Sequence, residues 1–460
     1  MKTRLYGYQK QGVRRMERFD IRALLADEMG LGKTLEFLAT YRRNHKTCSP
    51  AVVVCPASLK WNWAREAMMH IGVRAEIAEG RTPPRQGRFK PDHRLVIINY
   101  EILPYWMDWL EDLDPQLIGI DECQYIKNRD TQRTKAVKHL CRGRPHIVGM
   151  SGTPLTSRPA ELYPMLNILM PDMFNSFMTY AWDYCKPRRT PWGWEYKGAT
   201  NLDELHELLT ETCMIRRRKA DVLDQLPDKT RIVVPFELSK DGRKEYDYAE
   251  NNFMRWLAKS QGKARAASAR KAAQLVKMGY LKRLAASLKY DQTTTWVDDF
   301  FDNSDGKLVL FGVHKKIIQP LVERYKSSCV LVDGSVSGRK RQVAVDKFQG
   351  KDKIRLFVGN LQAAGVGLTL TAAHNAAFCE LGWTPGEHTQ GEDRIHRIGQ
   401  ENAASCYYLV ARNTIEEDLC LVLQEKQAVL EATLDGAGSG DDLDIFDQLT
   451  ERIKQRREAA

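Results

Sequence analysis

Residues 24–34 read Leu-Leu-Ala-Asp-Glu-Met-Gly-Leu-Gly-Lys-Thr, and this run decides the fold class of the chain. Its apolar start predicts a short strand, a glycine-rich turn follows, and a helix is expected to begin near Lys33. Backbone N–H groups in such a turn surround a phosphate, the lysine reaches the outer phosphates, and the threonine hydroxyl binds Mg²⁺. The strict phosphate-loop pattern has glycine where this chain has Asp27. The run predicts a nucleotide and Mg²⁺ site, whose candidate residues are Asp27, Glu28, Met29, Gly30, Leu31, Gly32, Lys33 and Thr34.

The size and charge of the chain narrow the possible classes of protein. Its 460 residues are more than a single hydrophobic core usually contains, which predicts two or three domains. No apolar run approaches the roughly 20 residues of a membrane helix, and the N-terminus lacks a signal-peptide core. We therefore expect a cytoplasmic protein with no membrane partner. The formal charge of +11 favours a polyanionic partner, and ten scattered cysteines indicate buried thiols in a reducing compartment.

Short apolar runs alternate with helical segments along most of the chain. This alternation predicts parallel sheets with helices on both faces and functional loops at the carboxyl ends of the strands. The first series of runs comprises residues 51–54, 95–98, 117–120 and 147–150. The second series comprises residues 308–311, 330–332, 356–358 and 376–378. The predicted fold is therefore α/β, with two parallel-sheet lobes.

The division into domains follows from these two series. An N-terminal nucleotide-binding lobe is expected over residues 1–235, with a helical and hairpin insertion at about 155–230. A helical, basic connecting region is expected over 236–300, and the C-terminal lobe over 301–432. Residues 433–460 read as a linker and a short charged helix, which gives a short helical C-terminal tail.

The segment 251–290 contains ten Lys or Arg residues and no acidic residue. Its apolar residues recur at helical spacing, so one face of a helix is expected to pack against a lobe. The basic face has two interpretations: it is solvated, or it lies along a phosphate backbone. The apolar positions are Leu275, Met278, Leu281, Leu284 and Leu288.

A second unusual segment, 180–196, concentrates aromatic residues. Local packing around a hairpin and stacking on nucleic-acid bases both remain open for it. The aromatic residues are Tyr180, Trp182, Tyr184, Trp192, Trp194 and Tyr196.

Two further motifs follow predicted strands of the first lobe. Asp121 and Glu122 come directly after the run 117–120, where Asp121 could hold Mg²⁺ and Glu122 could polarise the attacking water. Ser151 and Thr153 follow the run 147–150. Because all these strands end at one edge of a parallel sheet, the two hydroxyls are expected near Glu122, where they could relay the nucleotide state.

A pair of arginines in the second lobe completes the set that phosphoryl transfer requires. Arg394 and Arg397 are three residues apart, which would make them neighbours on one helix face. They either form ion pairs with Glu392 or Asp393, or they present their guanidinium groups to the γ-phosphate held by the first lobe. In the second case they would act only when the lobes close.

With these four motifs in order, the chain resembles the superfamily-two, helicase-like ATPases of the SWI/SNF type. The run 27–34 and the run Arg394-Ile-His-Arg397-Ile-Gly399-Gln400 are signatures of that family, and the resemblance extends over about residues 5–430. Residues 157–163 and 191–196 look most like its annealing-helicase, or fork-remodelling, subgroup. The resemblance implies two RecA-like lobes, ATP and Mg²⁺ as cofactors, and Glu122, Arg394 and Arg397 as catalytic residues.

The same resemblance implies roles for residues that the pattern alone does not assign. Gln9 would contact adenine, and Gly365 would belong to the nucleotide site. The residues implied to couple nucleotide state to movement are Gln124, Ser151, Thr153, Gln390 and Asp393. The residues implied to contact DNA are Ser58, Asn99, Gly367, Thr369 and Trp383. Gln124 stands where relatives usually have histidine, and because glutamine donates and accepts hydrogen bonds we expect coupling to survive.

The leading functional hypothesis is an ATP-driven translocase on double-stranded DNA, with strand annealing or fork remodelling on branched DNA as a further activity. It would be a monomeric motor that contacts the DNA backbone without sequence preference. The alternatives are a strand-separating DNA or RNA helicase and a nucleotide-gated DNA-binding module without turnover. We expect a bacterial, archaeal or viral source and association with the nucleoid.

Overall fold

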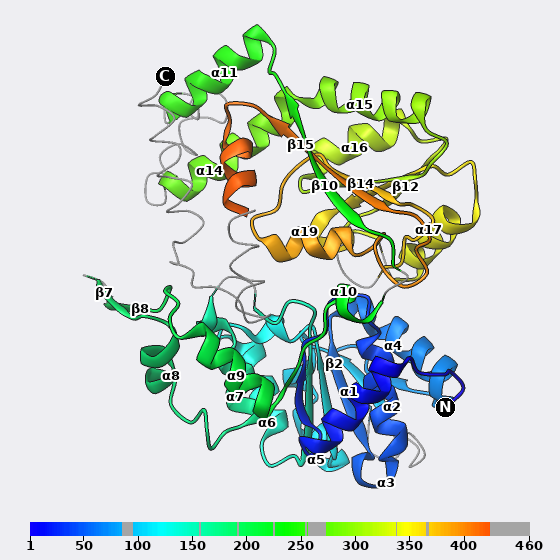
Figure 1. Ribbon diagram of the computed structural model, residues 1–460, viewed down its shortest axis with the longest axis vertical. Helices are drawn as coiled ribbons and strands as arrows, with labels where there is room; N and C mark the ends of the chain where they lie inside the picture. The colour runs from blue at the N-terminus through cyan, green and yellow to red at the C-terminus, as the bar shows by residue number, and fades with distance from the viewer. Residues whose placement is uncertain are drawn as a thin grey trace. The chain divides into compact units, whose positions relative to one another are not determined.

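Two parallel sheets organise the chain, as the sequence predicts. The computed structural model describes residues 1–84, 95–155, 158–190, 193–223, 226–253, 255, 273–336, 338–364 and 368–423. They divide into unit 1, Met1–Leu226, and unit 2, from Pro227 onward, each with its own sheet and covering helices (Figure 1). The predicted α/β fold with two parallel-sheet lobes is confirmed. The predicted tail at 433–460 lies outside the described residues.

The sheet of unit 1 has seven strands in the order β3-β4-β2-β5-β6-β1-β9. All four apolar runs of the first series form strands of this sheet. β2 and β4 are buried along their whole length, because helices cover both faces of a parallel sheet. The strands are β1 (Arg22–Leu25), β2 (Ala51–Cys55), β3 (Glu76–Ile77), β4 (Leu95–Asn99), β5 (Leu117–Asp121), β6 (His146–Met150) and β9 (Met214–Ile215).

The helices of unit 1 include the segments that connect its strands and the insertion expected near residues 155–230. The insertion also carries an antiparallel hairpin, β7 (Arg188–Thr190) with β8 (Gly193–Glu195). The α-helices are α1 (Gly7–Arg18), α2 (Lys33–Arg43), α3 (His45–Cys48), α4 (Lys60–Glu66), α5 (Met107–Leu113), α6 (Gln132–Cys141), α7 (Tyr163–Leu169), α8 (Phe177–Tyr184), α9 (Leu202–Thr212) and α10 (Lys219–Val222). The short 3₁₀ and π segments are η1 (Ala57–Leu59), η2 (Ala67–Ile71), η3 (Leu103–Tyr105), η4 (Cys123–Ile126) and η5 (Pro159–Glu161).

The sheet of unit 2 has six strands in the order β10-β15-β14-β11-β13-β12. All four runs of the second series form strands. The strands are β10 (Lys229–Phe236), β11 (Leu308–Gly312), β12 (Cys329–Val332), β13 (Leu356–Asn360), β14 (Asn375–Phe378) and β15 (Ala404–Ala411). The helices are α11 (Lys240–Asn251), α14 (Ala273–Leu288), α15 (Tyr290–Asn303), α16 (Lys315–Arg324), α17 (Gly338–Gly350), α18 (Leu361–Ala364) and α19 (Pro385–Glu392).

The boundary between the lobes differs from the expected position. Residues 229–235 are expected in the first lobe, but they belong to β10, which pairs in parallel with the whole of β15 in unit 2. β10 is an edge strand in which no residue is fully buried; its first three residues are polar, and Pro235 follows its short apolar run Ile232-Val233-Val234. Its Pro235 is tolerated because an edge strand leaves one row of N–H groups unpaired.

The expected connecting region at 236–300 is likewise part of unit 2. α14 packs its apolar stripe into the core of that unit: Met278 and Leu281 are buried, and Leu284 and Leu288 contact the same cluster. The stripe is therefore confirmed at these four positions.

The described basic residues of α14, together with Lys289 directly after it, do not form one solvated face. Lys289 is fully buried and pairs with Glu416 at 2.6 Å. Lys282 is also buried and lies 4.5 Å from the centre of the Trp383 ring. Residues 256–272, which carry half of the cations of the segment, lie outside the described residues.

The ten cysteines are free thiols, and nine of them are buried. Within the described ranges, the helices are all too short or too polar to cross a membrane.

Candidate nucleotide-binding site

The turn after β1 gathers the first set of predicted residues. Gly30 and Gly32 adopt φ angles of 89° and 86°, in the left-handed region that favours glycine. A Cβ on Gly32 would also lie 2.5 Å from Nε2 of Gln9. Lys33, the first residue of α2, donates from Nζ to the carbonyl oxygens of Asp27 at 2.6 Å and of Glu28 at 3.2 Å. Loss of hydration lowers the pKa of Lys33, and the nearby Asp27 carboxylate opposes this shift.

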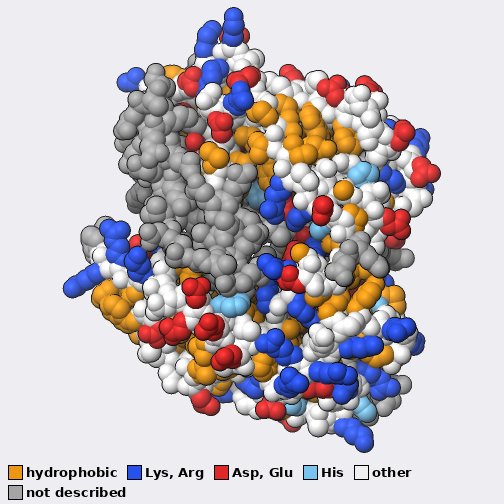
Figure 2. All heavy atoms as spheres, in the orientation of Figure 1, with side chains coloured by type: hydrophobic (Ala, Val, Ile, Leu, Met, Phe, Trp, Pro, Cys, Tyr) orange, Lys and Arg blue, Asp and Glu red, His pale blue; other side chains and the backbone are white. Residues whose placement is uncertain are grey.

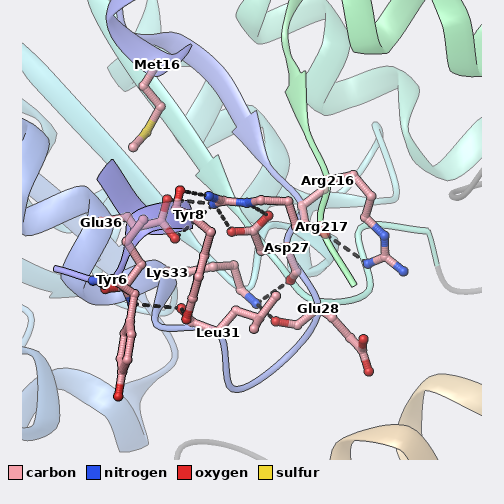
Figure 3. A network of polar contacts seen from close by, with 12 residues as sticks. Tyr6, Tyr8, Met16, Asp27, Glu28, Leu31, Lys33, Glu36, Arg216 and Arg217 are labelled. Carbon is pink, nitrogen blue, oxygen red and sulfur yellow. Dashed lines mark hydrogen bonds and ion pairs between the residues drawn. The ribbon is translucent and has the colours of Figure 1, made fainter. Parts of the chain in front are cut away.

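Asp27, the departure from the strict phosphate-loop pattern, anchors this turn. Its fully buried carboxylate accepts a 2.9 Å hydrogen bond from Nε of Arg217 and a second bond from Nη2 of the same guanidinium (Figure 3). Nη2 of Arg217 also donates to both oxygens of Glu36 in α2, at 2.9 and 2.7 Å. Arg217 therefore connects the start of the turn to the helix that follows it.

The segment after β9 makes further contacts with the same turn. Nη1 of Arg216 donates to the carbonyl oxygens of Ala26 at 2.9 Å and of Gly152 at 3.2 Å. The backbone N–H of Lys219 donates to Glu28 at 2.7 Å. Sequence reasoning missed these cations. The sequence does contain a signal, the basic run Arg216-Arg217-Arg218-Lys219 directly after the apolar pair 214–215. This run is distant in sequence from the acidic residues that it binds.

Gln9 lies against the other side of the turn. Its Nε2 donates to the carbonyl oxygen of Leu31 at 3.0 Å, and its Oε1 accepts from the backbone N–H of Tyr6 at 3.0 Å. The hydroxyl of Tyr8 donates to the same Leu31 carbonyl at 2.9 Å. Gln9 thus holds the turn in place, and its contact with adenine stays a prediction.

The acidic pair lies at the end of β5, and β6 separates that strand from β1. Oδ2 of Asp121 accepts a 2.7 Å hydrogen bond from Nε1 of Trp63, which sequence reasoning also missed. Loss of hydration and the adjacent Glu122 charge raise the pKa of Asp121 to about 7, against the opposing effects of Trp63 and Lys33. A bound cation would stabilise the charged forms of these two neighbouring carboxylates. Carboxylate oxygens are among the donors that Mg²⁺ prefers. Asp121 therefore fits the predicted metal role.

A continuous chain of side-chain hydrogen bonds links this acidic pair to the turn after β6. Gln124 donates from Nε2 to Glu122 at 2.7 Å and accepts at Oε1 from the hydroxyl of Ser151 at 2.7 Å. The oxygen of Ser151 in turn accepts from the backbone N–H of Thr153 at 3.0 Å. Gln124 thus uses both the donor and the acceptor of its amide.

Gly152 brings the same turn into contact with the turn after β1. A Cβ at this position would lie 2.2 Å from Cγ of Met29 and 3.3 Å from Nζ of Lys33. The three motifs of unit 1 therefore meet at the carboxyl ends of β1, β5 and β6.

The arginines of unit 2 lie in a different local structure from the one expected. α19 ends at Glu392, so Arg394 and Arg397 occupy the turns that follow and do not share a helix face. The N–H groups of Arg394 and Ile395 donate only three residues back, to the carbonyl oxygens of Gly391 and Glu392 at 3.1 Å each, which is the bonding of turns. The N–H of Leu370 also donates to the carbonyl oxygen of Arg394 at 2.9 Å, which ties this segment to the preceding motif. The two Nη1 atoms nevertheless meet, because both donate to the carbonyl oxygen of Leu368, at 3.2 and 3.3 Å.

The neighbours of these arginines serve structural contacts. Glu392 is fully buried and bound to Lys229 at 2.8 Å and Arg231 at 2.7 Å, both from β10. These cations keep the pKa of Glu392 well below its usual range. Asp393 lies 3.7 Å from Lys229, and the carbonyl oxygen of Gln390 accepts from Nε of Arg394 at 3.0 Å.

The predicted DNA contacts are distributed over both units. In unit 1, Ser58 is half-buried in η1, which follows β2, and Asn99 ends β4 with its amide donating to Glu101 at 2.6 Å. In unit 2, Thr369 is half-buried, and the backbone N–H of Trp383 donates to Glu387 at 2.7 Å. Gly365 and Gly367 lie outside the described residues. The DNA-binding roles stay predictions.

Comparison with known families agrees with this arrangement. The SNF2-related domain matches residues 8–287, and the helicase conserved C-terminal domain matches residues 292–399. Over 474 residues the chain is 33% identical to SWI/SNF-related matrix-associated actin-dependent regulator of chromatin subfamily A-like protein 1 of Xenopus tropicalis, covering 99% of this chain and 48% of that protein. Over 453 residues it is 33% identical to the DNA annealing helicase and endonuclease ZRANB3 of Mus musculus, covering 95% and 41%.

The chain therefore spans about half the length of these curated relatives, and the predicted likeness to the annealing-helicase subgroup is confirmed. Among solved structures, the Sulfolobus solfataricus SWI2/SNF2 ATPase core in complex with dsDNA aligns with 23% identity and a TM-score of 0.46, covering 99% of this chain and 97% of that one.

Proposed function

The chain belongs to the SNF2 family of helicase-like ATPases, and from this premise we propose that it hydrolyses ATP with Mg²⁺ in order to move along double-stranded DNA. Annealing or remodelling of branched DNA is part of the proposal, because a relative that is similar over 95% of this chain is a DNA annealing helicase. The observation that carries the proposal is the chain of contacts from the turn after β1, through Gly152 and Ser151, to Gln124 and Glu122.

This chain of contacts suggests how the residues divide the chemistry. Lys33, Thr34 and Asp121 would hold the phosphates and Mg²⁺, and the bound metal supplies positive charge to the transferring phosphoryl group. Glu122, oriented by the amide of Gln124, would position the attacking water. A movement of the Glu122 side chain would be transmitted to Ser151 through the hydrogen bonds of Gln124. These three residues are therefore suited to couple the nucleotide state to the turn after β6.

The proposal requires unit 2 to supply Arg394 and Arg397. Their convergence on one carbonyl oxygen keeps two guanidinium groups together. Such a charge at a phosphoryl-transfer site contributes roughly 10³ to 10⁵ in rate. Replacing either arginine by glutamine should therefore lower kcat and leave nucleotide binding to unit 1 nearly unchanged.

The proposed macromolecular partner is duplex DNA, contacted at its phosphate backbone. A formal charge of +11 favours a polyanion, and phosphate contacts carry little sequence information. Affinity for duplex DNA should then be independent of sequence and should fall steeply with salt. Ser58, Asn99, Thr369 and Trp383 are the residues proposed to contact it. The cytoplasmic location and the microbial or viral source stay predictions.

Steady-state ATP hydrolysis with and without duplex DNA tests the proposal. Duplex DNA should stimulate hydrolysis many-fold, and Glu122→Gln should abolish turnover while the protein still binds ATP. Glu111→Gln, at a surface glutamate bonded to His139, is the matched control and should be unaffected. Equal rates with and without DNA would refute the proposal.

A second assay separates translocation from strand separation. A translocase on duplex DNA should displace the third strand of a triplex in an ATP-dependent manner without unwinding a forked duplex. Unwinding of the fork with the same efficiency would instead identify a strand-separating helicase.

A further inference from the structure

The aromatic segment 180–196 divides into a buried half and an exposed half. On α8, Tyr180 and Tyr184 are buried in the core of unit 1, which accounts for them by local packing. Trp182 on the opposite face of α8 is 54% exposed, and Trp194 on β8 is 45% exposed. Packing within the unit therefore does not account for the two tryptophans.

The two exposed indoles lie together. Their ring centres are 5.4 Å apart, and the planes meet at 67°. Trp194 pairs directly across the hairpin with Arg189, so both side chains leave the same face of the two strands. That face thus combines two exposed indoles with a guanidinium group; we call Trp182, Trp194 and Arg189 the hairpin face.

Among the described residues from 182 to 197, exposed basic residues outnumber the exposed acidic residue Asp183, which follows Trp182. Lys186, Arg188 and Arg189 are all exposed. The charge of Glu195 on the same hairpin is matched by Lys197 at 2.9 Å. The hairpin extends away from α8 in Figure 1, and Lys and Arg side chains mark its position beside a hydrophobic patch in Figure 2. Among the described strands, β7 and β8 pair only with each other, so the edges of the hairpin are not part of either large sheet.

We propose that the hairpin face binds a short segment of single-stranded DNA, with unpaired bases stacked on Trp182 and Trp194 and a phosphate bound to Arg189. Exposed aromatic rings beside cations are the arrangement that holds single strands, because every base has a stacking face. The bases of an intact duplex are already stacked on one another, so the face would select unpaired DNA. An apolar protein segment would cover the indoles but would leave the cations without a complementary charge.

This inference rests on the proposed function, since it assumes that DNA is the substrate, and it adds a site for the unpaired strand of a branched substrate. Binding of fluorescein-labelled oligo(dT) to the full chain, measured by anisotropy, tests it. Trp182→Ala with Trp194→Ala should weaken binding by about tenfold or more. The double Phe variant should retain most of the affinity, because phenylalanine still stacks.

Two further measurements separate a DNA site from a merely structural role. Arg189→Gln should lower the slope of log K against log salt by about 0.7, the value for one phosphate contact on a single strand. Tyr105→Ala is the matched control, because Tyr105 is also 50% exposed and also contacts an arginine, with Arg81 5.0 Å from its ring centre. It should bind oligo(dT) as the unmodified protein does.

The outcome is distinguishable from failure of the proposed function. Duplex-stimulated ATP hydrolysis should stay within about twofold in the double alanine variant, whereas absence of stimulation in the unmodified protein would refute the motor itself. Unchanged oligo(dT) affinity in the double alanine variant would overturn the inference. So would tighter binding of oligo(rU) than of oligo(dT), or a change of sedimentation in place of a change of DNA affinity, which would identify a second copy of the chain as the occupant.

Discussion

Replacing Arg217 by methionine should destabilise unit 1 more than the same replacement of an exposed arginine. The guanidinium binds two fully buried carboxylates, Asp27 and Glu36, and its loss would leave both without this cation. Removing one partner of a buried ion pair costs about 3–5 kcal/mol. The presence of two carboxylates favours the upper end of that range. Protonation of Glu36, whose pKa burial already raises, offsets part of the loss, so we expect about 4 kcal/mol.

The assay must resolve unit 1 from unit 2, because a single unfolding transition is not guaranteed for two units. Hydrogen–deuterium exchange of peptides from β1 and β6 reports on unit 1, and peptides from β11 provide an internal reference in unit 2. The expected loss should appear in β1 and β6 and leave β11 unchanged.

Two further variants test the electrostatic reason for that loss. Arg218→Met is the matched control, because Arg218 is exposed and pairs with Asp221 three residues away, a contact that contributes less than about 1 kcal/mol. Combining Arg217→Met with Asp27→Asn and Glu36→Gln should restore more than half of the lost stability, since the buried charges are then gone. A loss in Arg217→Met within about 1 kcal/mol of that in Arg218→Met would refute the reasoning.

Three other changes give distinct expected results. Gln124→Leu removes both hydrogen bonds between Glu122 and Ser151 and should reduce DNA stimulation of ATP hydrolysis about tenfold, with ATP affinity measured by equilibrium binding nearly unchanged. Gly152→Ala would place Cβ 2.2 Å from Cγ of Met29 and should weaken ATP binding about tenfold, an effect that the added change Met29→Ala should partly reverse. Burial lowers the pKa of His388 to about 4, so as the pH falls the imidazole of the unfolded chain is protonated before that of the folded chain. The free energy of unfolding of unit 2, measured in urea, should therefore fall by up to about 3 kcal/mol between pH 6.5 and pH 4. His388→Gln should remove that dependence.

The central strands could be predicted from the sequence because short runs of consecutive apolar residues indicate their burial. β2, β4 and β11 are buried at every position and each begins with four consecutive apolar residues, which a window of five residues reveals. β10 could not be assigned in this way, because its first three residues are polar, Pro235 follows its short apolar run, and its partner, β15, comes from a distant part of the chain. The expected boundary between the lobes was wrong for that reason.

The candidate site shows the same difference between local and distant information. Lys33 and Asp121 belong to patterns of spacing that a reader of the sequence can recognise. Arg217 lies 190 residues from Asp27, and only the return of the chain as β9, beside β1, brings the two together. The helix expected for Arg394 and Arg397 is wrong for a related reason: α19 ends at Glu392, and the carbonyl oxygen of Arg394 accepts from Leu370, in the preceding motif.

The absence of glycine at position 27 follows from the backbone of the turn. Gly30 and Gly32 have positive φ angles, and a side chain at Gly32 would meet Gln9, so both angle and space favour glycine there. Asp27 is not among the residues with positive φ, so its position places no such restriction on the side chain. The chain can therefore place a carboxylate at the start of the turn, where Arg217 binds it together with Glu36. The residue that departs from the strict pattern thus fixes the entrance of the turn to the helix that begins with Lys33, and the pattern is kept at the two positions where backbone geometry requires it.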